Sequence, residues 1–493
     1  MKSIPQEIRD IASLLALRKH QGYLVGGCVR DMLLGKEPKD WDIATDARPE
    51  EIQSMFPEHI YENAFGTVAI KTGSGDERLK IVEVTTFRRE GKYTDKRHPD
   101  EVVFADTIEE DLARRDFTIN ALALDTSRDI QGSSSDTNTI IDPFGGRSDL
   151  KQKLIRAVGK PEERFGEDAL RILRAVRLAA ELGFALEVKT REAARLQAGL
   201  LEMIAKERIR DEFIKIVMSE RAMEGIKLLE DIGLLRFIAH ELREGIGCDQ
   251  NKHHIYTVWE HNLRALDYAA KKNYSLEVRL ASLLHDVGKP RTKRGEGSDA
   301  TFYSHEVVGA NMTSVMLDRL RFRKDTVEKV THLVRHHLFY YNVGEVSAAG
   351  VRRFLSRVGV EHVDDLLKVR EADRIGSGVP KAVPYKLRHL LFMIESVRRD
   401  PISPKMLAVK GEDVMETLGI PPGPRVGHIL AVLLDRVLDC PKQNTRETLR
   451  LEMQILDKLS DDELMAAAET ARNKKGELEE EAEGEIKKKY HVS

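Results

Sequence analysis

The sequence contains few cysteines and no long apolar run, and each shortage argues against a class of protein. Only three cysteines occur among 493 residues, at positions 28, 248 and 440. This odd, widely spaced set argues against a disulfide framework and a cysteine zinc site, so we expect a reducing, cytoplasmic environment. No apolar run approaches the roughly 20 residues of a membrane helix. The start, MKSIPQEIRD, also lacks the apolar stretch of a signal peptide, and we expect no membrane partner.

An excess of charge of one sign is also missing. The chain has 79 Lys and Arg against 82 Asp and Glu, which gives a net charge of -3. Whole-chain charge therefore does not indicate a nucleic-acid-binding protein. However, the acidic segment 477–485 offsets basic charge elsewhere, so any RNA contact has to lie on one local basic face. A hydrophobic fraction of 41% and a length of 493 residues predict a globular protein of several domains.

Strand patterns are confined to the first 150 residues. They occur at 23–25, 41–44, 67–71, 80–87, 102–104 and 139–141, with helical patterns at 5–20 and 29–34. From about residue 150 onward, apolar residues such as Leu170, Leu173 and Val176 recur at helical spacing. We therefore predict an α+β fold in four parts. These are a head with a mixed sheet (1–150), an all-α neck (151–245), a third helical domain (246–376) and a helical tail (377–493).

Two aspartates stand at a predicted strand in the head. Asp40 and Asp42 flank Trp41, and because strand side chains alternate between faces, both carboxylates should project the same way. Such a pair suits Mg²⁺, which keeps coordination sites for substrate phosphates. Taken alone, the pair is more often a solvated turn. Glu83, within the otherwise apolar strand 80–87, either faces solvent or joins the pair as a third metal ligand.

A glycine pair lies just upstream of these aspartates. Gly26 and Gly27 separate a predicted strand from a helix, which lets backbone N–H groups approach phosphates or simply forms a tight turn. Arg30 follows about one turn into that helix, where its guanidinium can reach the same phosphates.

The neck carries a stripe of charged residues at three-residue intervals. Asp168, Arg171, Arg174 and Arg177 share one helical face in this reading, either as a salt-bridged surface or as a reader of bases. Cytosine and adenine offer an amino donor beside a ring-nitrogen acceptor, which an aspartate and an arginine match. Uracil and guanine offer the reverse order and would leave unsatisfied groups, at ~1–3 kcal/mol each.

Histidines and aspartates form a second set of metal-binding side chains in the third domain. His285 and Asp286 are adjacent near a predicted helix end, ahead of Lys289, which can receive a phosphate. The set also includes His261, His305, His336, His337 and Asp373. Imidazole and carboxylate ligands together suit a divalent metal. The alternative is that these histidines are ordinary core or surface residues.

The head motifs, in this order, resemble class II tRNA nucleotidyltransferases, the family of CCA-adding enzymes and bacterial poly(A) polymerases. The segments that carry the resemblance are 26–35, 40–42, 83–88 and 109–121. It implies a polymerase-β-like head with Asp40 and Asp42 as the catalytic metal ligands. It further implies nucleotide contacts from Gly27, Arg30, Arg115, Asp168, Arg171, Arg174 and Arg177. Within 88–99 it implies a loop that switches the site from C to A, with Glu90, Asp95 and Arg97 as candidates and His98 in place of a frequent arginine.

The second set is similar to the HD phosphohydrolase superfamily. His261, His285, Asp286 and Asp373 match its motif, so the resemblance implies an HD domain over 246–376 with a divalent metal. His305 and His337 are additional candidates, and the choice between His336 and His337 stays open, as does activity. In the tail, Lys405, Lys410, Arg425 and a turn at Gly427 are either tRNA backbone contacts or helix caps.

These readings together predict template-independent addition of CMP and AMP, from CTP and ATP, to the 3′ end of tRNA. The chemistry would be two-metal nucleotidyl transfer with Mg²⁺ and release of pyrophosphate, with a second divalent metal in the HD site. One alternative is an A-adding tRNA nucleotidyltransferase or a poly(A) polymerase. Poly(A) polymerases usually carry a Gly-Arg-Arg-Phe-like run where this chain has residues 63–67. Another alternative is an HD-type nucleotide phosphohydrolase. Nothing in the sequence indicates the oligomeric state.

Overall fold

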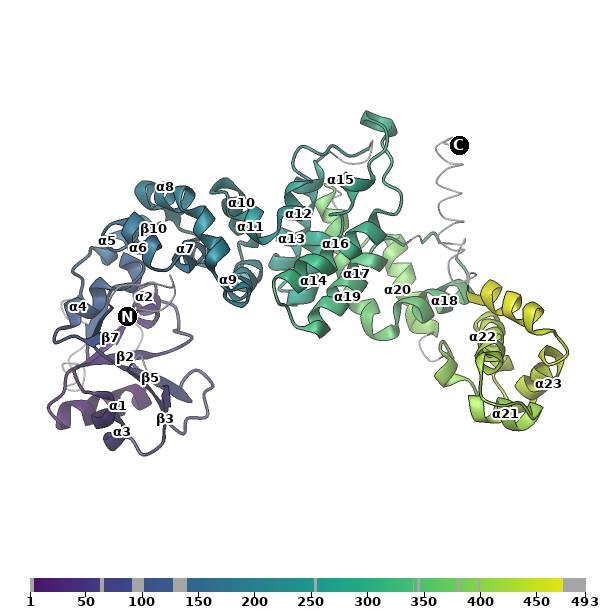
Figure 1. The fold of residues 1–493 in the computed structure, drawn as a ribbon, viewed down its shortest axis with the longest axis horizontal. Coiled ribbons are helices and arrows are strands. Elements are labelled where there is room, and N and C mark those ends of the chain that lie inside the picture. Colours follow the sequence, from purple (N-terminus) through teal and green to yellow (C-terminus); the bar gives the residue numbers. More distant parts are fainter. Residues whose placement is uncertain are drawn as a thin grey trace. The chain divides into compact units, whose positions relative to one another are not determined.

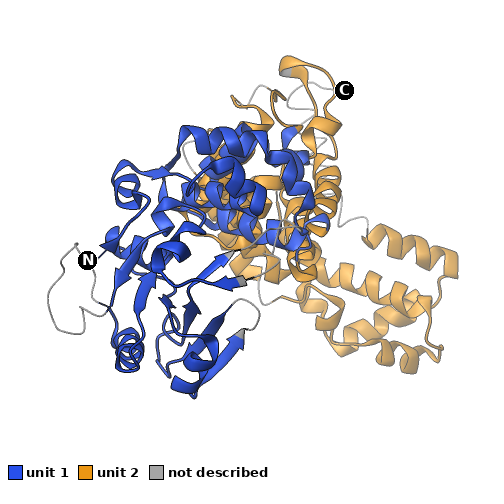
Figure 2. Ribbon diagram, turned by 60° about the vertical axis from the view of Figure 1, so that its left-hand side comes forward, with its two compact units in different colours: residues 1–243, 319–322 blue, residues 244–318, 323–493 orange. Residues whose placement is uncertain are grey.

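The computed structural model describes most of the chain, in two compact units. The described residues are 4–62, 66–90, 102–126, 140–251, 255–339, 341–343, 346–378, 382–397 and 400–472. One unit comprises residues 1–243 with 319–322, and the other comprises 244–318 with 323–493 (Figure 2). Within the described ranges, no helix has the length and hydropathy needed to cross a membrane.

A seven-stranded mixed sheet forms the head. Its strands are β1 (Gly22–Val25), β2 (Asp42–Thr45), β3 (His59–Glu62), β4 (Thr67–Lys71), β5 (Ile81–Thr86), β8 (Ala123–Asp125) and β9 (Ile140–Ile141), in the order β3-β4-β5-β2-β1-β8-β9. Only β2 and β5 pair in parallel, and the other neighbours are antiparallel. The α+β class and the mixed sheet are thus confirmed. The predicted strand at 102–104 is β7 (Val102–Phe104), which pairs with β6 (Arg88–Glu90) in a separate ribbon.

The sheet forms where apolar residues alternate along the chain. In β5 the side chains of Val82, Val84 and Thr86 are buried, whereas Glu83 between them points to the opposite face and is exposed. Helices α1 (Gln6–Leu17), α2 (Gly27–Leu33) and α3 (Pro49–Met55) pack against the strands (Figure 1). The alternation therefore places the Glu83 side chain on the opposite face of the sheet from the buried Val82 and Val84.

The neck is helical apart from one short strand pair. Its helices are α5 (Gly146–Gln152), α6 (Pro161–Glu167), α7 (Leu170–Leu182), α8 (Val188–Leu196), α9 (Lys206–Met218) and α10 (Ala222–Asp231). The parallel pair β10 (Leu154–Ile155) and β11 (Ala185–Leu186) was not expected from the sequence. Two residues per strand are too few to produce a recognisable alternation.

Helix α7 carries most of the predicted charged stripe. It buries Leu170, Leu173 and Val176, as the spacing predicts, and ends at Gly183, whose φ is +70°. The placement of Asp168 on this helix is wrong. Asp168 follows the last residue of α6 in extended backbone, and its carboxylate accepts a hydrogen bond from the Leu170 backbone N–H at 3.0 Å. Aspartate favours such positions because its short side chain reaches nearby backbone donors.

Five helices form the core of the second unit. They are α13 (Val258–Lys271), α14 (Leu276–Leu284), α16 (His305–Arg319), α17 (Lys324–His336) and α19 (Val360–Gly376). Helix α13 packs along both α14 and α19, and α14 packs on α17. The remaining helices include α18 (Ala348–Val358), α20 (Tyr385–Val397), α21 (Gly411–Leu418), α22 (Pro424–Asp439) and α23 (Arg446–Leu456).

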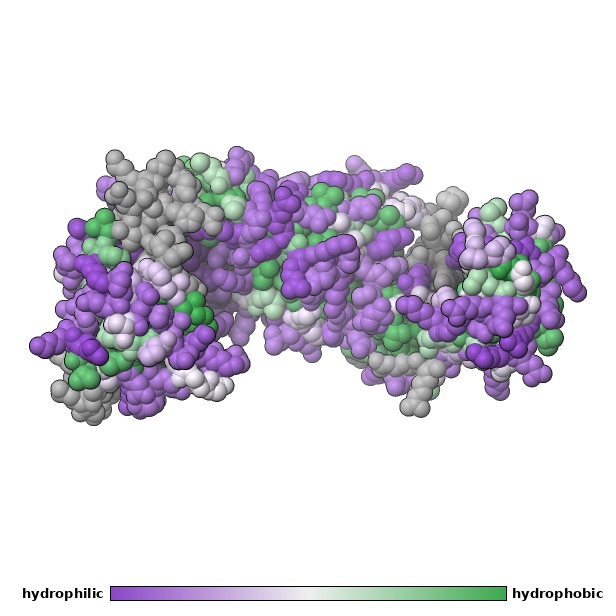
Figure 3. Space-filling model, turned by 60° about the horizontal axis from the view of Figure 1, so that its bottom comes forward, coloured by the Kyte–Doolittle hydropathy of each residue, from purple (hydrophilic) through white to green (hydrophobic). Residues whose placement is uncertain are grey.

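The turn expected at Gly427 is wrong, because this residue lies in the first turn of α22. The chain turns earlier, before Pro424, which starts the helix at a position where its missing N–H is tolerated. The buried face of Val426, Ile429 and Leu433 then drives the helix through Gly427. On the face drawn in Figure 3, hydrophilic side chains predominate and hydrophobic ones form small separate areas.

Candidate functional site

A polar pocket of about 610 Å³ lies within the first unit, between the head sheet and the neck helices. All ten head and neck residues predicted from the sequence line it, namely Gly27, Arg30, Asp40, Asp42, Glu83, Arg115, Asp168, Arg171, Arg174 and Arg177. Residues separated by almost 140 positions thus share one cavity. The carboxylates and the arginine row are brought together, as the predicted site requires.

The acidic wall of the pocket is built on two parallel strands. Asp42 opens β2 and lies in register with Glu83 of β5. Asp40 lies in the bend before β2 and is exposed, so strand alternation is not what places it in the pocket. Burial raises the pKa of Asp42 to about 6, Arg115 opposes this rise, and Asp40 and Glu83 add to it. The higher proton affinity of Asp42 therefore comes mainly from its burial, with the two neighbouring carboxylates adding to it.

The three carboxylates do not form a tight cluster by themselves. Among the residues that the structure describes, the only groups of three or more ligand atoms within 4.8 Å of one another lie in the second unit. Like charges without a cation between them repel, which favours a looser arrangement. Carboxylate oxygens on adjoining strands are nevertheless the donor type that Mg²⁺ prefers.

Gly26 allows the guanidinium of Arg115 to approach the acidic wall. Its φ is +78°, and a Cβ there would lie 2.7 Å from Nη1 of Arg115 and 3.7 Å from Oδ2 of Asp42. Arg115 is held on its other side by the buried Asp111, with Nη2 at 3.3 Å from Oδ2. In the α2 helix, Arg30 donates from Nη1 to Oδ1 of Asn120 at 2.8 Å. Glycine is required at position 26 for both backbone conformation and space.

Each arginine of the neck stripe has a carboxylate partner. Arg171 Nη1 lies 2.5 Å from Oε2 of Glu167, and Arg177 Nε lies 2.9 Å from Oε2 of Glu212. Arg174 Nε donates to Oδ2 of Asp116 at 2.7 Å. The pairs fix the direction of each guanidinium.

The acid partners Asp116 and Glu212 were missed from the sequence, as was Arg208, which pairs with Asp168. Burial alone would raise the pKa of Asp116, but Arg174, Asn120 and Arg171 hold it well below its usual range. Asp116 stands within the segment 109–121 that carries the family resemblance, so a signal existed for it. Nothing comparable marks Arg208 or Glu212.

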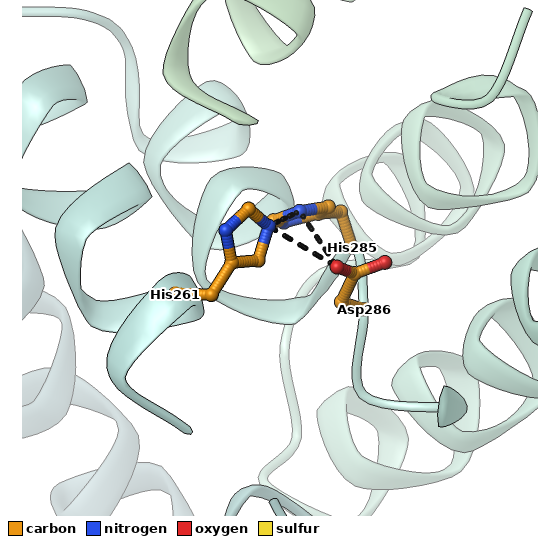
Figure 4. A group of neighbouring side chains, drawn as sticks. All are labelled: His261, His285 and Asp286. Carbon is orange, nitrogen blue, oxygen red and sulfur yellow. Dashed lines mark hydrogen bonds and ion pairs between the residues drawn. The ribbon is translucent and has the colours of Figure 1, made fainter. Parts of the chain in front are cut away.

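The second candidate site lies in the core of the other unit. His261 of α13 and His285, just after α14, face each other with their Nε2 atoms 2.8 Å apart (Figure 4). His261 Nε2 lies 3.1 Å from Oδ2 of Asp286 and 3.3 Å from Oδ1 of Asp373. All four side chains are buried or nearly so, with Asp373 the most exposed at 13%. This convergence matches the predicted ligand set.

Asp286 also faces a second group of ligands. Its Oδ1 lies 3.3 Å from Nε2 of His305 and 3.6 Å from Nε2 of His337. Of the two adjacent histidines, this geometry favours His337 as a ligand, because the ring of His336 lies against that of His332, with centroids 4.5 Å apart. Two groups of potential metal ligands, His261–His285–Asp286 and Asp286–His305–His337, therefore share one aspartate.

Electrostatics at this cluster favour a cation. Burial disfavours charge on His285, but the Asp286 carboxylate outweighs it and raises the pKa of His285. Burial would likewise raise the pKa of Asp286, but Lys289 and His285 hold it well below its usual range. Lys289 Nζ lies 2.7 Å from Oδ2 of Asp286. A bound divalent cation would replace the proton that the raised pKa of His285 favours, because His and Asp bind a metal in their deprotonated forms.

The remaining predicted positions lie apart from both sites or outside the described residues. Arg425 is paired with Asp457 and Asp461, and the Lys410 ammonium donates to the carbonyl of Lys405. The loop candidates Asp95, Arg97 and His98 and the segment 63–65 lie outside the described residues, as does the side chain of Glu90.

Family models match three stretches of the chain. They are described as the poly A polymerase head domain (residues 22–156), the probable RNA and SrmB-binding site of polymerase A (183–245) and the HD domain (258–375). An A-adding tRNA nucleotidyltransferase of Deinococcus radiodurans is 35% identical over 425 residues, which cover 84% of this chain and 90% of the relative. The chain belongs to the class II tRNA nucleotidyltransferase family, with an HD domain.

Members of this family that are named for different specificities are similar to the chain over most of its length. A CC-adding tRNA nucleotidyltransferase of Thermus thermophilus is 35% identical, covering 83% of this chain and 88% of the relative. A CCA-adding enzyme of Enterococcus faecalis is 32% identical, and the match covers 91% of this chain and 96% of the relative. The crystal structure of the Bacillus stearothermophilus CCA-adding enzyme in complex with CTP superposes with a TM-score of 0.67 at 30% identity. The superposition covers 92% of this chain and 98% of that enzyme.

Proposed function

We propose that the protein adds CMP and AMP, without a template, to the 3′ end of tRNA. The observation that carries the proposal is the single pocket in which Asp40, Asp42 and Glu83 face the arginine row of the neck. A phosphoryl-transfer site needs a cation site beside fixed positive charge, and a template-independent enzyme needs protein groups that read the base. The lining supports the proposal, because it includes carboxylates that could hold a cation and side chains that could read a base, and relatives named for all three specificities are similar to the chain.

The reaction is in-line attack of the tRNA 3′-hydroxyl on the α-phosphate of CTP or ATP, with pyrophosphate leaving. Asp40 and Asp42, with Glu83 as a third ligand, would hold Mg²⁺, which would supply neutralisation of the phosphate charge and a lowered pKa of the attacking hydroxyl. Gly27, Arg30 and Arg115 orient the triphosphate, with Arg174 and Arg177 as further contacts of the triphosphate or base. Burial, with smaller contributions from Asp40 and Glu83, raises the pKa of Asp42 to about 6, and a divalent cation bound there would stabilise its ionised form.

Base selection rests on Asp168 and Arg171 at the far wall of the pocket. The Asp168 carboxylate accepts from the exocyclic amino group of cytosine or adenine, and the Arg171 guanidinium donates to the ring nitrogen. Uracil and guanine present a carbonyl and an N–H in the reverse order, so each leaves two polar groups unsatisfied. Because Arg171 is buried, that loss is not recovered from water.

Incorporation of labelled CTP and ATP into three RNAs tests the proposal. We expect CMP and AMP addition to tRNA lacking CCA, AMP addition to tRNA ending in CC, and none to unrelated RNA. Labelling of unrelated RNA with AMP would indicate a poly(A) polymerase, and labelling only of tRNA ending in CC would indicate an A-adding enzyme. Asp42→Ala should abolish incorporation while tRNA binding survives, and normal rates in this variant would refute the metal assignment.

A second activity is favoured by the cluster around Asp286. Its two ligand groups, buried and shared through one carboxylate, fit a divalent metal and a phosphate ester. We propose metal-dependent phosphohydrolase activity on a nucleotide or on the tRNA end. Asp286→Ala should abolish release of phosphate while CMP and AMP incorporation persists. If Asp286→Ala stopped all activity and Asp42→Ala stopped none, the protein would instead be an HD phosphohydrolase.

The proposed location is the cytoplasm, where the tRNA substrate is matured. The three free thiols, Cys28, Cys248 and Cys440, agree with a reducing compartment.

A further inference from the structure

Helix α9 forms a second wall of the nucleotide pocket, and the sequence gives no sign of this role. Arg208, Glu212 and Lys215 are spaced i, i+4 and i+7 along it, so they share one face. Arg208 and Lys215 line the pocket, and α9 packs along α7, the helix that carries the arginine row. The adjoining face of α9, with Ile209, Phe213 and Ile216, is buried. The helix is thus rigidly held, with its charged face toward the nucleotide.

Arg208 contacts the proposed base reader directly. Its Nη2 donates to Oδ2 of Asp168 at 2.9 Å, and its Nη1 lies 3.5 Å from Oδ1. The same Oδ1 accepts from the Leu170 backbone N–H at 3.0 Å. Side chains of Arg208 and Asp168 are only 25% and 14% exposed, so water competes little for this pair. The Asp168 carboxylate is therefore fixed by one guanidinium and one backbone N–H.

A fixed carboxylate discriminates between bases only while it keeps its direction. Aimed at the amino group of cytosine, it meets the O4 carbonyl when uracil occupies the same place, and two acceptors face each other. A carboxylate free to rotate could instead accept from N3–H of uracil, or from N1–H of guanine, and the discrimination would be lost. A carboxylate oxygen has two lone pairs, so Asp168 can keep Arg208 and still accept from the base.

We infer that Arg208 is a positioning residue for base selection, which orients Asp168 and thereby excludes UTP and GTP. The inference rests on the proposed base-reading role of Asp168. It deepens that role by naming the residue that makes the reading selective. At the other end of the row, Oε2 of Glu212 lies 2.9 Å from Nε of Arg177.

Steady-state incorporation of CTP and UTP into tRNA lacking CCA tests the inference in the full chain. In Arg208→Ala the ratio of kcat/KM for CTP to that for UTP should fall by at least about tenfold, the scale of one lost charged hydrogen bond. Arg208→Lys keeps one donor and should restore part of the ratio. The matched control is Arg191→Ala. Arg191 is an exposed residue of α8 that pairs with Asp231 of α10 and does not line the pocket. That variant should leave the ratio unchanged.

A double-variant cycle separates positioning from other roles. If Arg208 acts through Asp168, removing it in an Asp168→Ala background should change the ratio no further. A further, additive fall would overturn the inference. So would an equal rise in KM for CTP and UTP, which indicates a phosphate contact. A lowered melting temperature with an unchanged ratio, in both Arg208→Ala and Arg208→Lys, would show a purely structural role. If the wild type adds no nucleotide to tRNA, the proposed function fails; if it adds CMP and these ratios do not move, only the inference fails.

Discussion

Neutralising Asp42 should stabilise the protein while abolishing its activity. In the folded chain the pKa of Asp42 is raised to about 6 from its ordinary value of 3.8, first because of burial and then because of Asp40 and Glu83. A group that binds its proton more tightly in the folded state contributes stability below its unfolded pKa and loses it as the pH rises through its folded pKa. At about 1.4 kcal/mol per pH unit, ionisation of Asp42 costs up to about 3 kcal/mol at neutral pH.

Asp42→Asn removes this cost and keeps the shape of the side chain. In EDTA at pH 8 we expect the variant to be more stable by about 1–3 kcal/mol, which raises the melting temperature by roughly 3–10 °C. The gain should shrink as the pH falls through 6 and vanish only below about pH 3, where the wild-type carboxyl is protonated in both the folded and the unfolded state. Asp40→Asn is the matched control, since Asp40 is exposed and its substitution should change stability by less than about 0.5 kcal/mol.

Thermal unfolding at pH 5 and pH 8, followed by circular dichroism with and without Mg²⁺, measures these effects. Mg²⁺ should stabilise the wild type by mass action and the Asp42→Asn variant much less. A variant less stable than the wild type at pH 8, or a difference that is the same at both pH values, would refute the account of charge at this wall.

Two further predictions concern the packing of the second unit and the reactivity of a thiol. Gly288→Ala should destabilise the unit by about 2–4 kcal/mol, because its Cβ would lie 2.2 Å from the His305 carbonyl oxygen and 2.5 Å from the Gly309 nitrogen. The control Gly427→Ala, in helix α22 with nothing within 4 Å of its Cβ, should stabilise by about 0.4–1 kcal/mol, and equal melting temperatures for the two variants would contradict the packing. Burial raises the pKa of the Cys28 thiol to about 12, so peptide mass spectrometry should find it unmodified by iodoacetamide at pH 8 until the chain is unfolded, and modification of the native protein would show that the head core opens.

The elements that could be predicted are those whose burial repeats along the chain. Strand β5 alternates Val82, Glu83 and Val84, and α7 buries residues at helical spacing, so both are visible in the sequence. Strand β3 was missed because Ile60 and Tyr61 at the sheet edge are 44% and 42% exposed, which removes the alternation. Strand β8 was missed because Ala123 and Leu124 are both buried although they point to opposite faces, so the strand shows no alternation.

The same reason explains which residues of the candidate sites could be predicted. Residues within short motifs could be, and residues that depend on a distant partner could not. Residues within short motifs, such as Asp42, Arg115 and His285, were found because their neighbours in sequence mark them. Arg208 was not found because its partner Asp168 is 40 positions away, and Asp116 was not assigned because its partner Arg174 is 58 positions away. Which carboxylate meets which guanidinium depends on how α9 packs on α7, and no local pattern contains that packing.

Every arginine of the neck stripe pairs with a carboxylate, and these pairs affect both the affinity for a triphosphate and the discrimination between bases. An incoming triphosphate gains only the difference between its own contacts and the ion pairs that it displaces, so the arrangement weakens binding relative to unpaired guanidinium groups. The pKa of Asp116 is held well below the usual range, so Asp116 stays ionised near neutral pH and keeps its ion pair with Arg174. What the pairs provide is fixed direction, which matters most for donors and acceptors that must distinguish one base from another. The structure thus favours selection of the base over affinity for the triphosphate.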